Sequence, residues 1–414
     1  MSPGPLLHAA EAFGTPLYVY DLDAVHRRID TLEALFGSRF GISYAIKANP
    51  NPALLASIAP RLSTFDASSW HEVERGLAAG MPAGRVTFSG PAKRYGEIRS
   101  AVESGVGELV VENLDEARQA GAFASMAGRR QAVLLRINPA RVPRGFGASM
   151  AGTPSQFGVD EEDMFPALDA IMTTPGLDLI GFHIYSGTNC RDPEAIAANF
   201  GIFAEIFRAA QAHSGIRPKR LVFGSGFGIP YLPGEAELDH DALPALVDPI
   251  IDGLLAEPAF AQARCNLEMG RWLTGLAGWL LTGVISGKRS RGSEIRACDA
   301  GFNAHLAACG MMGSVIRRNW VFANLTNPEG APGIWTLVGP LCTTIDRLAL
   351  DVELPEVRPG DILSIAASGA YGLTASPTRF ISHPEPREAV IEGGVLRDAT
   401  DTRPAVSTVA AAAE

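Results

Sequence analysis

The chain has 414 residues, of which 47% are hydrophobic and 19% charged, and its formal net charge is −10 at pH 7. This much apolar material excludes a wholly disordered chain, and an acidic chain without a long Lys/Arg run is not expected to bind nucleic acid, which needs a basic face. The five cysteines lie far apart with no C-x-x-C pair, which excludes a disulfide scaffold and a zinc site and is typical of a reduced, cytoplasmic protein.

Short apolar, β-branched runs alternate with helical patterns over the first 270 residues. A strand-like run at Leu17–Tyr20 comes first, and eight more follow, at Ile42–Ile46, Thr64–Ala67, Val86–Ser89, Glu108–Glu112, Ala132–Asn138, Leu177–Ile184, Arg220–Gly224 and Arg264–Glu268. Amphipathic stretches such as Trp70–Ala79 and Pro193–Ala212 lie between most of them. The alternation predicts parallel α/β units, and eight of them fit a (β/α)8 TIM-type barrel, with a doubly wound open sheet as the alternative.

After Glu268 the pattern becomes β-rich. Strand-like runs occur at Ala277–Ser286, Ile334–Val338, Ile362–Ile365 and Ala389–Ile391, with turn signals between them. We expect a barrel over 25–268, a β-rich domain over 269–395 that the N-terminal strand segment 14–24 joins, and a flexible tail over 396–414. The most apolar window, Leu273–Ile285, is too short to span a membrane, and the N-terminus lacks a signal-peptide pattern, so no membrane association is expected.

Reactive side chains gather at the C-terminal ends of the strands in a parallel barrel. Lys47 closes the first barrel run, where burial would lower its pKa and free a neutral amine for a Schiff base, although a salt-bridged lysine is the simpler interpretation. Other candidates at the run ends are Asp66, Arg136, His183, and Glu268 beside Arg271. A satisfied core histidine and a Glu268–Arg271 ion pair are the structural alternatives for these residues.

A glycine-rich loop, Gly224–Gly228, follows the seventh run. Its N–H groups could approach a phosphate, although it is not a G-x-G-x-x-G dinucleotide motif and an ordinary turn would also explain it. A strand-end lysine, a phosphate-sized loop, an acid and a flat side chain together match pyridoxal 5′-phosphate, which needs an aldehyde partner, a phosphate cradle, a partner for its ring nitrogen and a contact on its ring face.

With these residues in place, the sequence resembles the barrel-type (fold type III) pyridoxal-phosphate decarboxylases, the group that holds diaminopimelate, ornithine and arginine decarboxylases. The matching stretches are Tyr44–Asn49, Phe65–Ser68, Phe88–Pro91, Arg136–Asn138, Gln156–Gly158, Glu268–Arg271, Asp299–Gly301, Gly339–Cys342 and Gly369–Tyr371. The resemblance covers about residues 14 to 390 and implies a barrel with a C-terminal β-domain. It also implies a lyase that removes the α-carboxylate of an amino acid through a Lys47 Schiff base.

The resemblance also implies roles for single residues. His183 would stack on the cofactor ring and Glu268 would face the ring nitrogen. The phosphate would be held by Thr188, Ser225, Gly226, Gly270, Arg271 and Tyr371, with Asp66 and Arg136 near the Lys47 side of the ring. Cys342 would reach into the site of a partner subunit, which implies a homodimer with shared active sites, and Cys342 or Lys47 would return a proton to Cα. No metal is expected.

Some departures from the family pattern bear on the substrate. Diaminopimelate and ornithine decarboxylases usually place an acid directly after the cysteine, which helps to bind the distal ammonium of the substrate, whereas this chain has Thr343. A neutral residue there gives up the ~1.5–3 kcal/mol of a charge-assisted bond. The Arg-Pro-x-x-Tyr element of diaminopimelate decarboxylases is replaced by Phe302–Ala308, which contains His305. Ser225 for a loop glycine and Met269 for a proline remove no required group.

These departures resemble a subgroup of specialised biosynthesis, which includes a decarboxylase of carrier-protein-bound glutamate and exosortase-associated decarboxylases. Shared elements include Gln156–Gly158, Gly228–Tyr231, His305–Ala307, Ile316–Asn319 and Gly339–Thr343. This resemblance implies a substrate that lacks a free distal amine, either free or tethered to an acyl-carrier protein, with Cys342, Thr343 and His305 beside it. A diaminopimelate-, ornithine- or lysine-type decarboxylase, an amino-acid racemase and a non-catalytic cofactor-binding protein remain the alternatives.

Overall fold

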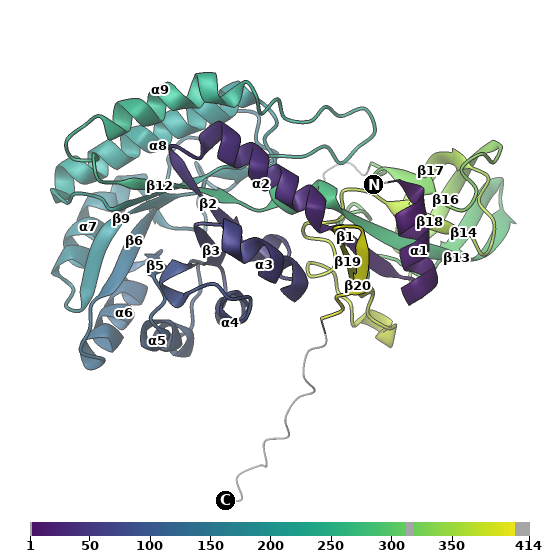
Figure 1. Cartoon of the computed structure of the whole chain (residues 1–414), viewed down its shortest axis with the longest axis horizontal. Helices are drawn as coiled ribbons and strands as arrows, with labels where there is room; N and C mark the ends of the chain where they lie inside the picture. The colour runs from purple at the N-terminus through teal and green to yellow at the C-terminus, as the bar shows by residue number, and fades with distance from the viewer. Residues whose placement is uncertain (1, 312–317, 402–414) are drawn as a thin grey trace, which may run out of the picture.

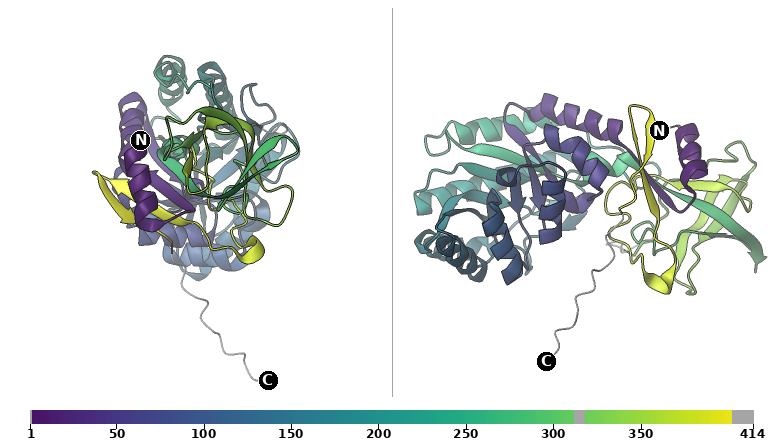
Figure 2. Two further views of the ribbon diagram at one scale, coloured as in Figure 1. Left: turned by 90° about the vertical axis from the view of Figure 1, so that its right-hand side faces the viewer. Right: turned by 60° about the horizontal axis from the view of Figure 1, so that its bottom comes forward.

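The computed structural model describes residues 2–311 and 318–401 of the chain. Figure 1 shows a barrel wrapped in helices beside a smaller β-rich body, and Figure 2 shows the same two parts from other sides. The chain begins in the β-rich body with α1 (Pro3–Phe13) and β1 (Leu17–Asp21) and then enters the barrel.

Eight parallel strands close the barrel in the order β5-β4-β3-β2-β12-β11-β9-β6, and β5 pairs with β6 to complete the ring. These strands are β2 (Phe40–Ala45), β3 (Thr64–Ala67), β4 (Val86–Phe88), β5 (Glu108–Val111), β6 (Gln131–Asn138), β9 (Leu177–Ile184), β11 (Arg220–Gly224) and β12 (Arg264–Met269). The short strand β8 (Val159–Asp160) pairs in parallel with β6, and β7 (Ala148–Ser149) pairs with β10 (Gly187–Thr188). The predicted closed barrel is confirmed and the open sheet is excluded.

Helices cover the outside of the barrel (Figures 1 and 2). They are α2 (Leu22–Phe36), α3 (Pro52–Ile58), α4 (Trp70–Ala78), α5 (Tyr95–Ser104), α6 (Leu114–Met126), α7 (Met164–Thr173), α8 (Pro193–Ser214) and α9 (Leu243–Leu255). Several begin at a side chain that accepts a hydrogen bond from the first turn, as Ser69, Asn113 and Asp192 do. The amphipathic stretches predicted at Trp70–Ala79 and Pro193–Ala212 agree with α4 and α8 to within two residues.

Aromatic side chains fill the layer between barrel strands and helices. Phe223 of β11 is fully buried, and its ring centroid lies 5.5 Å from that of Phe40, 5.3 Å from that of Phe200 and 5.2 Å from that of Phe207. These contacts join β2, β11 and α8. They hold in register two of the strands whose ends carry the candidate site residues.

The β-rich body is one mixed sheet that includes the N-terminal strand. Strand β13 (Gly278–Ser290) runs antiparallel to β1, β14 (Ser293–Cys298) and β18 (Ile362–Ile365), and β1 runs parallel to β19 (Arg387–Glu392). The other strands are β15 (Phe322–Asn324), β16 (Pro332–Val338), β17 (Arg347–Pro355) and β20 (Val395–Asp398). A short helix, α10 (Arg271–Thr274), connects the barrel to β13. The prediction that the N-terminal strand joins this sheet is confirmed.

Some expectations fail at the chain ends and edges. Helix α1 and strands β14, β15, β17 and β20 were not predicted, because these segments are short or have charged and polar residues that interrupt the apolar pattern. The expected tail begins too early, since β20 pairs with β19 and Ala399 donates its N–H to the carbonyl of Glu388. Residues 402–414 of that tail, and residues 316–317 of the Ile316–Asn319 element, lie outside the described residues.

The sequence predicts neither a membrane-spanning helix nor a disulfide scaffold. In the described part of the chain, no helix is long and apolar enough to cross a membrane. No disulfide joins any of the five cysteines, which all lie in the described ranges, and Cys342 is the exposed one among them.

We expect Phe223→Ala to lower the free energy of unfolding by about 3–5 kcal/mol, because it leaves a cavity among three other rings. Urea unfolding followed by circular dichroism would measure this loss. Met126→Ala is the matched control, since Met126 is 83% exposed and its truncation should change stability by no more than about 0.5 kcal/mol. Equal effects of the two substitutions would contradict this account of the core.

Candidate active site

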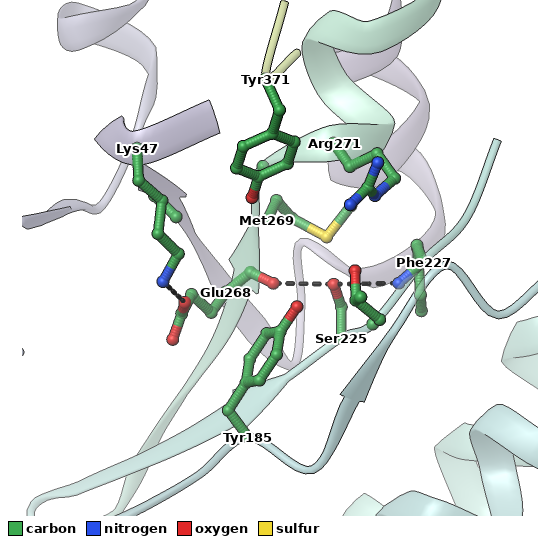
Figure 3. A pocket seen from close by; sticks show the side chains of 12 residues that line it. Lys47, Tyr185, Ser225, Phe227, Glu268, Met269, Arg271 and Tyr371 are labelled. Carbon is green, nitrogen blue, oxygen red and sulfur yellow. Dashed lines mark hydrogen bonds and ion pairs between the residues drawn. The ribbon is translucent and has the colours of Figure 1, made fainter. Parts of the chain in front are cut away.

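A recess lies at the C-terminal ends of the barrel strands, where the β-rich body covers the barrel. Its walls come from the ends of β2, β9, β11 and β12 and from one loop of the β-rich body (Figure 3). The lining residues are Ala45, Lys47, Tyr185, Thr188, Ser225, Gly226, Phe227, Glu268, Met269, Gly270, Arg271 and Tyr371. The recess opens into an outer cavity of about 590 Å³ that shares Lys47, Tyr185, Thr188, Arg271 and Tyr371 with it.

Lys47 lies between two buried carboxylates. It occupies a single 3₁₀ turn, Ile46–Ala48, directly after β2, and its Nζ is 3.7 Å from Oε1 of Glu268 and 3.8 Å from Oδ2 of Asp66. Burial by itself would lower the pKa of the Lys47 ammonium, but Glu268 and then Asp66 raise this pKa well above its usual value. The salt-bridged interpretation is therefore correct for the chain alone, and the expectation of a lowered pKa is wrong.

Glu268 is held as a carboxylate by its neighbours. Burial would raise its pKa, but Lys47, a hydrogen bond with His183 and the charge of Arg136 keep this pKa below its usual value. His183 Nε2 lies 2.9 Å from Oε2 of Glu268, and both side chains are buried. His183 lines neither the recess nor the outer cavity, and its Nδ1 has no hydrogen-bond partner among the described residues. It orients Glu268 in this arrangement, and its stacking on a cofactor ring stays a prediction.

Asp66 lies beside Lys47, and Arg136 lines the outer cavity together with Lys47, while their place beside a cofactor ring stays a prediction. Both carboxylate oxygens of Asp66 are buried without a hydrogen-bond partner among the described residues. Burial and the nearby Glu268 raise its pKa, so Asp66 binds a proton more readily than an ordinary aspartate. Arg136 lines the outer cavity, and its Nη1 lies 3.1 Å from Oε1 of the buried Glu112.

A cup for an anion lies at the other end of the recess. Gly226 has a φ of +65°, and an added Cβ would lie 2.6 Å from Phe146 and 2.7 Å from the Gly187 carbonyl oxygen, so only glycine fits there. The Nε of Arg271 is buried with no hydrogen-bond partner among the described residues, and its guanidinium lies 4.8 Å from the ring centroid of Tyr371. The backbone at Gly226, which carries no side chain, and the Nε–H of Arg271, which has no partner in the described ranges, together suit a phosphate.

Ser225, one residue of this cup, makes different contacts from those expected. The N–H of Ser225 donates to the carbonyl of Glu268 at 3.3 Å, and its hydroxyl donates to the same oxygen at 2.7 Å. Ser225 therefore holds β11 against β12, and its N–H is already engaged. Gly270 lines the recess, and an added Cβ would lie 3.1 Å from Cβ of Ala48 and 3.7 Å from the Tyr371 hydroxyl.

The site as a whole fits pyridoxal 5′-phosphate. Among the described residues that line the recess, Lys47 is the one lysine, Glu268 is a buried carboxylate, and Arg271 has an Nε without a partner, which can bind an anion. These groups come from different strand ends but face one space (Figure 3). Their chemistry matches the aldehyde, the ring nitrogen and the phosphate of this cofactor.

Cys342 and Thr343 lie outside this site in the single chain. They belong to a loop of the β-rich body and line neither the recess nor the outer cavity. Asp346 orders this loop by accepting the N–H of Phe302 and the N–H of Leu341, each at 2.8 Å. An ordered loop with an exposed cysteine is what a contact with a partner subunit would require, and that contact stays a prediction.

His305 lies behind the wall of the outer cavity. Its side chain is 0% exposed, its Nε2 is 3.1 Å from the hydroxyl of Ser368, and burial lowers its pKa to about 3. Its ring packs against the indole of Trp320, which lines the cavity. Among the described residues, His305 lines neither the recess nor the outer cavity; its ring supports Trp320, and its place beside a substrate stays a prediction.

Several site residues were missed by the sequence analysis. Tyr185 and Phe227 line the recess, while Tyr231 and Trp320 line the outer cavity with their rings 4.5 Å apart. Tyr185 follows His183 by two residues, and that spacing was a signal for the same strand end. Trp320 comes from the β-rich body, so no local pattern connects it with the barrel.

Comparisons with known proteins agree with this geometry. The family model described as "Pyridoxal-dependent decarboxylase, pyridoxal binding domain" matches residues 22–275. An L-glutamyl-[BtrI acyl-carrier protein] decarboxylase from Niallia circulans is 30% identical, over 92% of this chain and 90% of the relative. A diaminopimelate decarboxylase from Methanothermobacter thermautotrophicus is also 30% identical, over 93% of this chain and 88% of the relative.

A solved structure shows the same architecture. The diaminopimelate decarboxylase from Helicobacter pylori complexed with L-lysine superposes with a TM-score of 0.83 at 25% identity, and the match covers 95% of this chain and 96% of the other. The barrel and the β-rich body are therefore both shared with this relative.

Stability should depend on pH through His305. Because its pKa is about 3 in the folded chain and about 6.5 when unfolded, its contribution is complete above about pH 6.5 and is lost as the pH falls toward 3, at about 1.4 kcal/mol per pH unit. His305→Gln should therefore flatten the pH dependence of the unfolding free energy between pH 6 and 4, measured by urea unfolding. The exposed His8→Gln is the control and should leave that slope unchanged; an unaltered slope in His305→Gln would contradict the assignment.

Proposed function

Because this chain belongs to the pyridoxal-dependent decarboxylases, we propose that it removes the α-carboxylate of an amino acid whose distal end carries no free amine and which is presented on an acyl-carrier protein. Family membership makes the chain an enzyme, a decarboxylase that uses pyridoxal 5′-phosphate. The substrate is the part that we propose.

The charges around the outer cavity carry this proposal. Among the described residues that line it, the charged ones are Lys47, Arg136 and Arg271 and a single acid, Glu235. Glu235 is already engaged, since it pairs with Arg191 at 2.8 Å and accepts the N–H groups of Tyr231 and Leu232. No unused carboxylate is available there for a distal ammonium, and Thr343 offers none from the cysteine loop.

The size and lining of the cavity support a substrate longer than a free amino acid. A volume of about 590 Å³ lies in the range of pockets that enclose drug-sized ligands. Its outer wall includes the neighbouring rings of Tyr231 and Trp320, which offer apolar surface to an uncharged arm. The relative from Niallia circulans acts, by its name, on a glutamyl group attached to a carrier protein.

The chain's own residues would perform distinct tasks. Bound pyridoxal 5′-phosphate supplies the electron sink for the bond that breaks when carbon dioxide leaves. Lys47 would hold the cofactor aldehyde covalently, and Glu268, oriented by His183, would offer its negative charge to the ring nitrogen. Arg271, Gly226 and Tyr371 bind the phosphate, while Thr188 lines the same recess. Asp66 lies beside the amine of Lys47 and can hold a proton there.

The partner subunit would complete the site. We infer a homodimer in which the loop of Cys342 and Thr343 enters the outer cavity of the other chain. The exposed Cys342 thiol would then return a proton to Cα, and the neutral Thr343 would face the distal end of the substrate. The exposure of Cys342, on a loop that Asp346 holds in place, supports this arrangement.

Carbon dioxide release from a panel of substrates tests the proposed reaction. We expect release from a glutamyl or similar aminoacyl thioester on an acyl-carrier protein, and at least about 100-fold slower release from free lysine, ornithine or diaminopimelate. Lys47→Ala should abolish turnover and also the covalent cofactor adduct that borohydride reduction leaves in the wild type. Rapid turnover of a free diamino acid would contradict the proposed substrate, and racemisation without carbon dioxide release would contradict the reaction.

Mixed dimers test the shared site. Lys47→Ala and Cys342→Ala should each be inactive or nearly so, yet their mixture should recover about a quarter of wild-type activity, since half of the dimers then carry one intact site. Lys47→Ala mixed with Glu268→Ala is the matched control. These two residues lie in one recess of one chain, so no intact site can form. Absence of recovery in the first mixture, with hybrid dimers verified by mass spectrometry, would refute the shared site.

A further inference from the structure

Tyr185 lines the site, and the proposed function assigns it no role. It follows the end of β9 and lines both the recess and the outer cavity. Figure 3 shows its phenol pointing across the recess toward the phenol of Tyr371, with Lys47 on one side and Ser225 on the other. The Nζ of Lys47 lies 5.7 Å from the centroid of the Tyr185 ring.

The position of the ring is fixed by the backbone beneath it. A Cβ added to Gly224 would lie 2.3 Å from Cδ2 of Tyr185 and 2.8 Å from its Cα, so the tyrosine rests directly on the bare backbone of Gly224. Gly224 ends β11 and leads into Ser225 and Gly226 of the anion cup. The phenol is thus anchored to the same loop that forms the cup.

Two of the tyrosines differ from the others in the hydrogen bonding of their hydroxyl groups. The chain has seven tyrosines, and Tyr95 is 64% exposed. The hydroxyls of Tyr18, Tyr20, Tyr44 and Tyr231 each have a hydrogen-bond partner within the chain. Among the described residues, no such partner is found for the hydroxyls of Tyr185 and Tyr371, the two that face each other across the recess.

The surroundings of these two hydroxyls favour an anion. Arg271 lies beside Tyr371, with its guanidinium 4.8 Å from that ring, and its Nε is unused among the described residues. Arg271, Tyr371 and Tyr185 all line the same recess. Two unpaired hydroxyl donors and an arginine donor that converge on one space form a site for a phosphate rather than for a neutral group.

We propose that Tyr185 is a further phosphate-binding residue, whose hydroxyl donates a hydrogen bond to the cofactor phosphate from the side opposite Tyr371. The inference rests on the proposed function, because it takes the recess to hold pyridoxal 5′-phosphate. It assigns a hydroxyl donor from the end of β9 in addition to the groups from β11, β12 and the β-rich body.

Binding of two cofactor forms tests this assignment. The protein would be stripped of cofactor, and dissociation constants for pyridoxal 5′-phosphate and for pyridoxal, which lacks the phosphate, would be measured from the change in absorbance. Tyr185→Phe keeps the ring and removes only the hydroxyl. It should weaken binding of pyridoxal 5′-phosphate by about tenfold or more, while binding of pyridoxal should change by less than about twofold. Tyr371→Phe should show the same selectivity, and the exposed Tyr95→Phe should change neither constant.

Inorganic phosphate gives a second measurement on the same proteins. It should raise the melting temperature of the cofactor-free wild type more than that of Tyr185→Phe, because it stabilises the chain in proportion to its binding. Wild-type binding of the phosphate form by Tyr185→Phe, or an equal loss of both cofactor forms, would overturn the role of Tyr185. Failure of the wild-type protein itself to bind pyridoxal 5′-phosphate would instead overturn the proposed function.

Discussion

One ammonium group between two buried carboxylates is the interaction on which the site depends. Glu268 and Asp66 come from β12 and β3, and Lys47 follows β2, which lies between these strands in the barrel. Two buried carboxylates without a cation would be costly, so the strand ends can form this cluster only with Lys47 in place. Because Glu268 and Asp66 raise the pKa of the Lys47 ammonium, a positive charge on a bound cofactor would have to pair with one of these carboxylates before the amine could lose its proton.

The site is formed by residues of both the barrel and the β-rich body. Tyr371 in the β-rich body donates its N–H to the carbonyl of Ala48 at 2.8 Å, and the side-chain amide of Asn49 donates to the Gly369 carbonyl at 3.0 Å. These bonds tie the turn that carries Lys47 to the loop that carries Tyr371. The distance between the amine and the phosphate cup is therefore set by the contact between the two bodies, and the barrel by itself would supply an incomplete recess.

The outward half of the site differs in character from the inner half. The inner half is dense in charge and hydrogen bonds, as the pairing of His183 with Glu268 illustrates. The outer cavity is more spacious, and it combines the rings of Tyr231 and Trp320 with a few charged side chains, among which the acid Glu235 is already engaged. A rigid inner half suits a chemical step common to the family, whereas a spacious outer half allows the substrate to vary among its members.

The sequence by itself determined the barrel, its strands within one or two residues, the β-rich body and the candidates Lys47, Glu268, Arg271 and Gly226, because strand–helix alternation and strand-end chemistry are local patterns. Only the tertiary structure decided which groups meet. It placed His305 behind Trp320, engaged the N–H of Ser225 with Glu268, and brought Tyr185 and Tyr371 to face each other. Burial, pKa and hydrogen-bond partners arise from residues that are distant in the chain, and no local pattern encodes those contacts.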